Sequence, residues 1–509
     1  MAGNESMAGP GGTRSLKARW TVAGSLCLTS AAHLGNGEPG DTIDMPIGRS
    51  ACLGVANAEP IDLLAPPILT GASLAGGLRN YLADVLSGPL TEEPRGSPVE
   101  ALFGAVSVLG EVFSGSEPDE GFQSPLITFD SIGVLGDARV EVRDGLQIDP
   151  KSGVAAQTAK FDYEVIPPGT EFPVRVDLLV DDGADESQLL SLLVCALEGL
   201  ERGEIPIGAR KTRGLGRCTV QAWSARRFNL QTREGWLEWL MSDHVNPVAQ
   251  ECRRYSSVAE AVRTSVPPEL VLADVSTDLR SADCVRATVE LRFQGGLLVR
   301  SPGVGPYDAD VVHLRSGGTA VLPGTSLAGV LRARSRRIAH LVRKDKGDAD
   351  IWVSRLFGSE IEKGSSGTRP LVASRLRISE SALEGSARLR VTRIKIDRFT
   401  GGVIEGALLE EEPEFCGATL VRIELAKPQP GELGFLVLLL KDLITGDLVI
   451  GGAGSVGRGV ARGRTTIEVN GSALTIEPGI RIRPNDAKAL NDAVTEFWNA
   501  EQVSGGENA

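Results

Sequence analysis

The chain has 509 residues, of which 42% are hydrophobic, 23% are charged and only 5% are aromatic. At a rough prior of 150 residues per domain, this length predicts more than one hydrophobic core. The formal net charge of −13 argues against a generic nucleic-acid-binding protein, because domains of that class are usually basic.

The seven cysteines are scattered, with no CxxC pair and no Cys/His pair at zinc spacing, which argues against a zinc ribbon. An odd cysteine count, with no basic-then-apolar start in residues 1–13, predicts reduced thiols and a cytoplasmic location. Apolar runs reach about eight or nine residues, short of the ~20 that span a bilayer, so we expect no membrane partner. Residues 1–13 are expected to be a disordered tail.

Residues 16–28 alternate between apolar and polar types, which predicts a strand with one buried face. The segment GASLAGGLR (71–79) then opens a helix with Thr70 or Ser73 as its N-cap. Further elements are predicted as strands at 139–148, 160–166 and 172–180, a helix at 187–201 and a strand at 218–223. The order β-α-β-β-α-β is typical of a ferredoxin-like or RRM-like domain, here with long inserts.

The strongest signal in the sequence is an internal repeat. GTSLAGVLR (324–332) matches GASLAGGLR (71–79) at seven of nine positions, and other segment pairs follow in the same order. RDGLQIDPKSG (143–153) is echoed by TRIKIDRFTGG (392–402), and GARKTRGLGRC (208–218) by GGAGSVGRGVARG. A repeat of roughly 245 residues is too long for a solenoid unit, so each copy is expected to be a domain.

The predicted organisation is a disordered tail (1–13), a first domain (14–228), a linker with short helices (229–284), a second domain (285–470) and a C-terminal extension (471–509). The extension should hold a strand, a helix and a disordered tail. The helix should be amphipathic, with one apolar face formed by Leu490, Ala493, Val494, Phe497 and Trp498.

The loop 208–217 combines closely spaced glycines with four cations, Arg210, Lys211, Arg213 and Arg217. Glycines let backbone N–H groups approach a phosphate, and the cations add charge beside them. The alternative interpretation is a solvated basic turn. The loop is not a P-loop, because it lacks the GK[ST] ending and precedes a strand.

The start of each GxSLxGxLR helix offers free N–H groups to an anion. The alternative is a capped core helix, which certainly describes its leucines. The second copy continues with six basic residues and no acid within 332–344, which favours a nucleic-acid face over a solvated one. The further RNA-binding candidates are therefore Ser73, Arg79, Ser326, Arg332, Arg334 and, in the second glycine loop, Arg458.

Each copy also has an acidic, glycine-rich loop after its first strand, at 30–49 and 300–315. A loop carboxylate above a sheet can bind a divalent ion or position a 2′-hydroxyl, although aspartates are common in ordinary loops. His33 and His313 lie in these loops at different offsets, and we interpret them as ordinary loop residues.

Together these motifs resemble the RAMP superfamily of CRISPR effector proteins. The resemblance rests on the GxSLxGxLR helix start, the IDP/IDR-x-(T/S)G hairpins, the E-x-(I/V)P-x-GT-x-F strand pair and the RKTRGLGR loop. It covers roughly 14–224 and 285–468, and it is closest to backbone subunits of type III complexes, with two fused copies as in subtype D. The implied fold class is α+β, with two tandem ferredoxin-like/RRM-like (RAMP) domains carrying inserted loops and thumb hairpins.

The resemblance implies a subunit that binds CRISPR guide RNA, contacts other effector subunits and cleaves complementary target RNA with loosely bound Mg²⁺ or Mn²⁺. Asp44 in IDMPI matches the catalytic aspartate of the family. In the second copy Asp308 fits the register best, with Asp310 close behind, and no protein residue is assigned as a metal ligand. The hairpins at 148–153 and 396–401 would be thumbs. The alternatives are a non-catalytic guide-RNA scaffold or a guide-processing ribonuclease of the same superfamily.

The net charge is an average over unlike regions. Basic residues concentrate at 208–217, 332–344 and 458–464, whereas acids dominate at 177–204 and 405–414. Acidic outer faces limit indiscriminate RNA binding, so the sequence predicts RNA at the basic strips.

Overall fold

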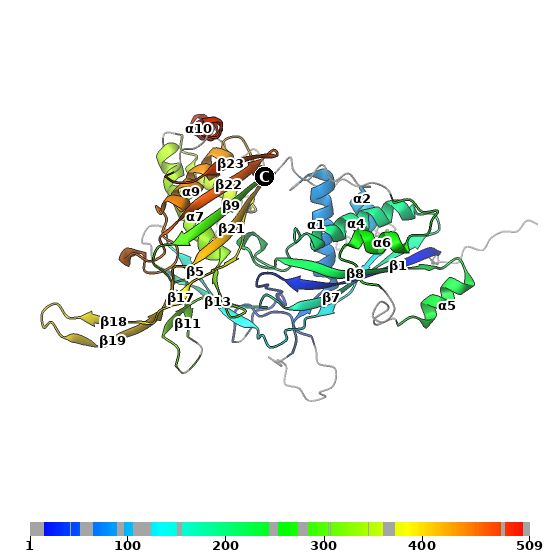
Figure 1. Ribbon diagram of the computed structural model, residues 1–509, viewed down its shortest axis with the longest axis horizontal. Helices are drawn as coiled ribbons and strands as arrows, with labels where there is room; N and C mark the ends of the chain where they lie inside the picture. Colours follow the sequence, from blue (N-terminus) through cyan, green and yellow to red (C-terminus); the bar gives the residue numbers. More distant parts are fainter. Residues whose placement is uncertain are drawn as a thin grey trace, which may run out of the picture.

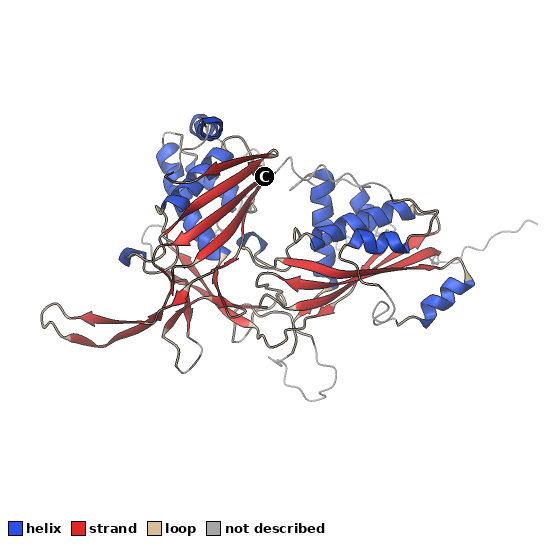
Figure 2. Cartoon of the chain, in the orientation of Figure 1, coloured by secondary structure: helices blue, strands red, loops and turns tan. Residues whose placement is uncertain are grey.

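The structure is a computed structural model, and it describes residues 15–40, 42–50, 65–88, 96–104, 124–149, 155–243, 253–272, 284–303, 305, 307–344, 346–359, 372–479 and 484–501. The two predicted terminal tails lie almost wholly outside these ranges. Two α+β units lie side by side, each with helices on one face of an antiparallel sheet (Figures 1 and 2).

The sheet of the first copy has the order β3-β7-β1-β8, with all pairs antiparallel. This is the ferredoxin-like order, in which the first strand lies between the third and fourth strands of the βαββαβ unit. One face of the sheet packs on its two main helices. The elements are β1 (Leu16–Leu28), α1 (Gly71–Ser87), β3 (Leu126–Thr128), β7 (Glu171–Asp181), α4 (Glu186–Glu201) and β8 (Cys218–Asn229).

The second copy repeats this arrangement and adds one edge strand, giving the order β15-β21-β9-β22-β23. Residues on β9 alternate, so that Val285, Ala287, Val289 and Leu291 are buried under the helices, as the period of two predicts. The elements are β9 (Cys284–Phe293), α7 (Gly324–Val342), β15 (Leu376–Ile378), β21 (Ala418–Ala426), α9 (Glu432–Thr445), β22 (Ala461–Val469) and β23 (Ser472–Ile476). The fold-class prediction is confirmed.

One hairpin is inserted between the second and third sheet strands of each copy. The strands predicted at 139–148 and 160–166 are present as β5 (Glu141–Ile148) and β6 (Ala155–Val165), but they pair with each other and do not belong to the four-stranded sheet. The sheet strand is instead β3, which the sequence prediction missed. The second hairpin is β18 (Val391–Ile396) and β19 (Val403–Glu412), and it projects far from its sheet (Figure 1).

Further short elements fill the connections: β2 (Ile68–Leu69), α2 (Pro98–Phe103), β4 (Ser131–Ile132), β10 (Gly296–Leu297), β11 (Arg300–Pro302), β12 (Val311–His313), β13 (Arg315–Ser316), β14 (Thr319–Leu322), α8 (Ala349–Phe357), β16 (Ser381–Ala382), β17 (Ala387–Arg388) and β20 (Glu414–Phe415). Thr70 caps α1 by accepting a hydrogen bond from the Ser73 N–H. The equivalent N-cap of α7 is Pro323, with no side-chain cap hydrogen bond.

Two helices follow β8 within the predicted linker: α5 (Arg233–Met241) and α6 (Val258–Ser265). Val258, Ala261 and Val262 of α6 are fully buried in the first core. The C-terminal helix α10 (Pro484–Asn499) buries Leu490, Ala493 and Phe497. Trp498 was expected on the same face, but it is 57% exposed. No helix in the described ranges is both long and apolar enough to cross a membrane.

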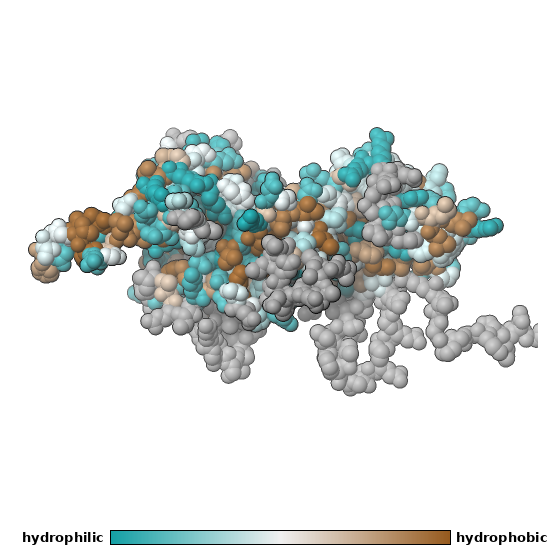
Figure 3. Space-filling view, turned by 90° about the horizontal axis from the view of Figure 1, so that it is seen from below, coloured by the Kyte–Doolittle hydropathy of each residue, from teal (hydrophilic) through white to brown (hydrophobic). Residues whose placement is uncertain are grey.

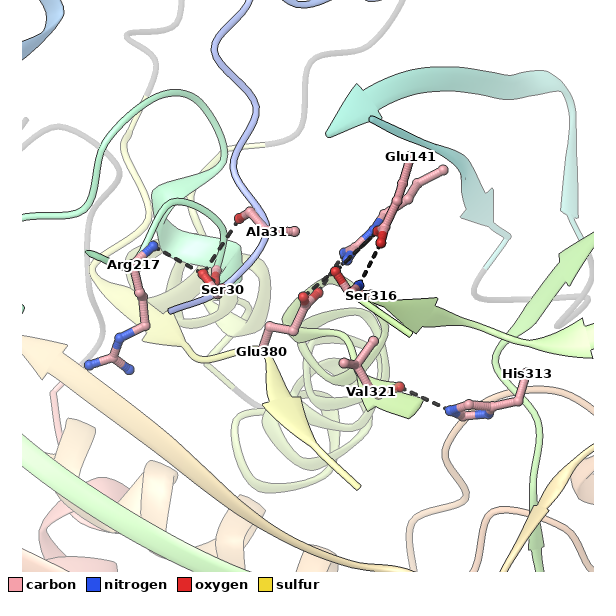
Figure 4. A network of polar contacts seen from close by, with 11 residues as sticks. Ser30, Ala31, Glu141, Arg217, His313, Ser316, Val321 and Glu380 are labelled. Carbon is pink, nitrogen blue, oxygen red and sulfur yellow. Dashed lines mark hydrogen bonds and ion pairs between the residues drawn. The ribbon is translucent and has the colours of Figure 1, made fainter. Parts of the chain in front are cut away.

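A buried ion pair joins the two copies. Arg143 on β5 donates from both terminal nitrogens to the Glu380 carboxylate, at 2.6 and 3.1 Å, and both side chains are almost fully buried. Burial lowers the pKa of Arg143, but attraction to Glu380 outweighs it and raises that pKa overall. Glu141 beside it accepts from Ser316 Oγ and the Gly317 N–H (Figure 4). These contacts fix how the two copies meet.

Candidate nucleic-acid interface

Asp44 lies in the acidic loop of the first copy, against β6. Its carboxylate accepts from the Asp162 N–H at 2.9 Å, and its own N–H donates to the Asp162 carboxylate at 2.7 Å. The next residue, Met45, forms a parallel bridge with Tyr163. The Asp44 side chain is exposed. The loop therefore presents a carboxylate to solvent at the base of the β5–β6 hairpin.

The second copy holds Asp310 in the same way. Its carboxylate accepts from the Glu410 N–H at 2.9 Å, and Val311 after it pairs in parallel with Glu411. Asp310 is also exposed. Asp310 is thus the structural equivalent of Asp44, and Glu410 is the equivalent of Asp162.

Asp308 was expected to fit this register best, and the structure corrects that expectation. Its carboxylate accepts from the Gly305 N–H at 2.7 Å within its own loop, two residues before the position that matches Asp44. The sequence alignment placed Asp310 opposite Pro46 and therefore Asp308 opposite Asp44. In the structure the loop instead docks through the parallel pairing of β12 with β19.

The glycine loops of the two copies share one backbone conformation. In the first, Arg210 is left-handed (φ 57°), a 3-10 turn covers Lys211–Arg213, and Gly214 is left-handed at φ 87°. In the second, Ala453 (φ 62°), a 3-10 turn over Gly454–Val456 and Gly457 (φ 86°) repeat this. The loops therefore align residue by residue, as the recurrence of glycine predicted.

The side chains on this shared backbone are different. The cations of the first loop align with uncharged residues of the second, in the pairs Arg210/Ala453, Lys211/Gly454, Arg213/Val456 and Arg217/Val460. The expectation of a basic strip at matched places in both loops is therefore wrong for these positions. What the repeat preserves here is the backbone path.

Arg210 stacks on the hairpin of its own copy. Its guanidinium carbon lies 4.8 Å from the Phe161 ring centroid and 4.4 Å from that of Tyr163. Burial lowers the pKa of Arg210, and Tyr163 opposes that shift. Cation–π stacking of this kind positions the arginine at the junction of loop and hairpin.

Lys211, Arg213 and Arg217 are half-buried, and in the part of the chain that is described none of these side chains makes an ion pair or hydrogen bond. Burial lowers the pKa of each, and a second-copy arginine adds to the effect: Arg377 beside Lys211, Arg332 beside Arg213. The Arg217 N–H donates to Ser30 Oγ while its guanidinium extends away from that contact (Figure 4). These three cations are held in place without an ion pair among the described residues.

Arg458 does not resemble these three cations. It aligns with Leu215, its side chain is buried, and its guanidinium donates to the Glu411 carboxylate at 2.6 Å. Arg393 Nε lies 3.1 Å from the same carboxylate. A buried, paired arginine offers no open charge to a phosphate, so the structure gives Arg458 a structural role.

The arginine of each GxSLxGxLR motif caps the helix that follows. Arg79 donates to the Gly104 carbonyl at 2.7 Å, at the end of α2. Arg332 donates to the Gly358 carbonyl at 2.8 Å, at the end of α8. Arg334 pairs with Asp442 on α9 at 2.6 Å. A cation at a helix C-terminus is stabilising, which gives Arg79 and Arg332 a structural role, and the ion pair gives Arg334 one. All three RNA-binding candidates therefore have structural contacts that the sequence did not predict.

Ser73 and Ser326 occupy the first turns of α1 and α7. Ser73 is exposed and Ser326 is half-buried. Their positions match between copies, and both remain candidates for an anion contact at a helix start.

Sequence reasoning missed three arginines on the helix-free face of the second sheet: Arg286 on β9, Arg377 on β15 and Arg422 on β21. They line a cavity of about 470 Å³ between the copies together with Lys211 and Arg217. The signal was available, because each lies out of phase with the buried residues of its strand and so must face away from the core.

Among the described residues, no three side chains of His, Cys, Asp or Glu gather as a metal-binding group. His33 and His313 are buried and bonded to backbone carbonyls, through Nδ1 to Glu164 and through Nε2 to Val321. Burial lowers the pKa of His313. Both histidines therefore support loop structure, in line with the interpretation from sequence.

The hairpins expose apolar side chains. Phe399 at the tip of β18–β19 is 86% exposed, and Asp397 orders the tip by accepting from the N–H groups of Phe399 and Thr400. Figure 3 shows a hydrophobic band on this projecting arm. The tip of the first hairpin, with most of the predicted thumb at 148–153, lies outside the described residues.

Comparison with known proteins places these features in one family. The family model described as the RAMP superfamily matches residues 54–219 and 290–462. The two matches correspond to the two copies. No curated protein matches the chain.

Proposed function

Because the chain belongs to the RAMP superfamily, which indicates a CRISPR-associated, RNA-binding role, we propose a more specific function for it. It is a double backbone subunit of a type III CRISPR ribonucleoprotein that binds guide RNA, assembles with other effector subunits in the cytoplasm and cleaves complementary target RNA. Asp44 and Asp310 are its catalytic residues, one in each copy.

One observation carries this proposal. Asp44 and Asp310 are 266 positions apart in a chain whose loops have diverged, yet each has its carboxylate on a backbone N–H of the neighbouring hairpin. Each hydrogen bond uses one carboxylate oxygen, and both residues are exposed. What the two residues share is the contact with the hairpin, whereas the carboxylate of Asp308, which is also exposed, accepts from a backbone N–H of its own loop.

The chemistry required is modest. A 2′-hydroxyl of the target RNA attacks the adjacent phosphate when the nucleotide is unstacked and can reach in-line geometry. The new P–O bond closes a 2′,3′-cyclic phosphate, and the bond to the 5′-oxygen of the next nucleotide breaks, with that oxygen taking a proton from water. The exposed apolar side chains of the hairpin arms are suited to displacing a base from its stack. The aspartate orients the hydroxyl and accepts its proton. Specificity resides in pairing with the guide, since the protein contacts the RNA backbone.

The residues fit a loosely held Mg²⁺ or Mn²⁺. Such ions are often bound through one or two carboxylates and complete their coordination with water and substrate phosphate. Asp44 with Asp162 provides two such carboxylates in the first copy, and Asp310 provides one in the second, where Glu410 is ion-paired with Arg390 at 3.2 Å. When bound, the ion supplies stabilisation of the negative charge that develops on the phosphate.

The test is cleavage of complementary RNA by the complex assembled on guide RNA in the presence of Mg²⁺. We expect Asp44→Ala and Asp310→Ala each to remove cutting at a different set of positions, by about a hundredfold or more, while target binding persists in a gel-shift assay. Asp308→Ala is the matched control and should cut normally, and EDTA should stop all cutting.

Two outcomes would overturn parts of the proposal. Undiminished cutting by the Asp44→Ala/Asp310→Ala double variant would remove the catalytic assignment and leave the chain a non-catalytic guide-RNA scaffold. A purified complex that holds no RNA would remove the RNA-binding assignment as well. A guide-processing role is disfavoured because both loop histidines are committed to backbone carbonyls.

A further inference from the structure

The cavity of about 470 Å³ between the copies has positive side chains on both walls. Lys211 and Arg217 come from the glycine loop of the first copy. Arg286, Arg377 and Arg422 come from the helix-free face of the second sheet. Because the two walls belong to different domains, their charges meet only where the copies dock.

None of these five side chains has an ion-pair or hydrogen-bond partner anywhere in the described ranges. Of the other charged residues in the lining, Arg202 pairs with Glu198 and Glu204 accepts from the Tyr81 hydroxyl, while Asp84 and Glu424 are the two remaining acids. Burial lowers the pKa of Arg217, and the nearby Arg422 lowers it further. Glu424, which also lies near Arg217, raises that pKa and so opposes both effects. The lining thus holds three acids against six cations, which leaves an excess of positive charge.

Docking alone does not account for this arrangement. Like charges facing each other across an interface are unfavourable, at a cost of several kcal/mol. The copies are already held together elsewhere by Arg143, Glu380 and Glu141. The cations in the cavity therefore weaken the docked state unless an anion lies between them.

We propose that this cavity binds the phosphates of a single RNA strand that crosses from the first copy to the second. Arg377 and Arg422 then act on the same strand as Lys211 and Arg217. This rests on the proposed function and adds to it, because it places a shared RNA-binding site at the junction of the copies. Pockets of ~300–1,000 Å³ hold single small ligands, so the cavity admits a short stretch of one strand and excludes a duplex.

The experiment measures binding of a fluorescein-labelled polyuridine oligoribonucleotide to the full chain across a series of salt concentrations. For Arg377→Ala/Arg422→Ala we expect roughly tenfold weaker binding, and a slope of log K against log[salt] that is smaller by about 1.4, or ~0.7 for each lost phosphate contact on a single strand. Arg377→Lys/Arg422→Lys keeps the charge and should keep most of the slope.

The matched control is Arg292→Ala/Arg462→Ala. These two arginines face the same side of the same sheet, opposite each other on β9 and β22, but they do not line the cavity. Their loss should leave the slope unchanged. An equal loss in both double variants would show that charge anywhere on this face suffices, and would overturn the proposal.

Two further outcomes separate the proposal from its premise. If Arg377→Ala/Arg422→Ala keeps the wild-type slope of log K against log[salt] while the wild type binds RNA, the cavity site is overturned and the proposed function stands. If the wild type binds no RNA, both are overturned. Equilibrium dialysis with ATP tests the other source of phosphate. ATP binding that this double variant loses, with an unchanged RNA slope, would assign the cavity to a free nucleotide.

Discussion

The two glycine loops have the same backbone conformation but different side chains, which are basic in the first loop and uncharged at the aligned positions of the second. Both turn through a left-handed residue, a 3-10 turn and a left-handed glycine. The first loop carries four cations, three of them with no partner in the described residues, whereas the second carries Ala453, Gly454, Val456 and Val460 at the same positions. Arg458, the one arginine within the residues 451–460 that align with the first loop, is turned inward to Glu411.

This difference separates what the glycines do from what the cations do. A glycine pattern persists when the backbone path must persist, whether or not the loop binds anything. Charge persists only where a ligand or partner requires it. The first loop carries its charge where it faces the arginines of the second copy, whereas the second loop carries no cation at the aligned positions. The comparison therefore supports the proposal that RNA contacts concentrate at the junction of the copies.

The largest effect is expected from breaking the buried pair of the second loop. Arg458→Ala leaves the Glu411 carboxylate buried with only Arg393 beside it. Breaking one partner of a buried pair costs roughly 3–5 kcal/mol, and we expect about 3 kcal/mol because Arg393 remains 3.1 Å away. Urea unfolding of the full chain measures the loss.

The control installs residues like those of the first copy, where Leu215 and Tyr163 occupy the equivalent buried positions. Arg458→Leu/Glu411→Leu should recover most of the stability, because a buried pair is often replaceable by apolar residues of similar volume. If Arg458→Ala instead leaves stability unchanged and lowers RNA affinity, Arg458 is an RNA contact after all, as the sequence first predicted.

The second prediction concerns the glycine that closes each loop. Gly214 and Gly457 have nearly the same φ, 87° and 86°, so alanine meets the same backbone strain of about 1–2 kcal/mol at each. A Cβ at Gly214 would lie 2.1 Å from the Glu380 backbone nitrogen, whereas nothing lies within 4 Å of one at Gly457. Only Gly214→Ala should separate the copies.

Small-angle X-ray scattering makes this comparison directly. Gly214→Ala should increase the radius of gyration, and Gly457→Ala should leave it at the wild-type value while lowering the melting temperature slightly. Equal radii for the two variants would mean that the copies do not dock through the first loop. The shared strain makes each variant the control for the other.

The sequence predicted more of the fold than of the interface. Alternation over 16–28 and the apolar run at 187–201 identified β1 and α4, because burial on one face imposes a period. The strand β3 was missed because three residues carry no period, and the hairpin strands took its place in the prediction. Arg79 and Arg332 were taken for RNA contacts because their carbonyl partners, at Gly104 and Gly358, are distant in sequence.

Asp310 shows the same limit on a smaller scale. Nothing local distinguishes it from Asp308, since both are exposed aspartates in one loop. The distinction comes from β12 pairing in parallel with β19, a long-range contact that no spacing rule encodes. Likewise, the cavity required two domains to be placed together before its five cations became one feature.

The smallest expected effect comes from exchanging one residue between the loops. Arg213→Val should reduce the slope of log K against log[salt] for polyuridine by about 0.7, and Val456→Arg should increase it by about 0.7, as one phosphate contact is lost or gained. Val456 is 59% exposed, so the new arginine needs no room in the core, and Val456→Gln controls for side-chain size. The double exchange should then restore the wild-type slope. If Arg213→Val lowers the slope while Val456→Arg leaves it unchanged, the second loop lies away from the RNA. Its lack of cations is then explained by its distance from the RNA and not by the loss of an earlier RNA contact.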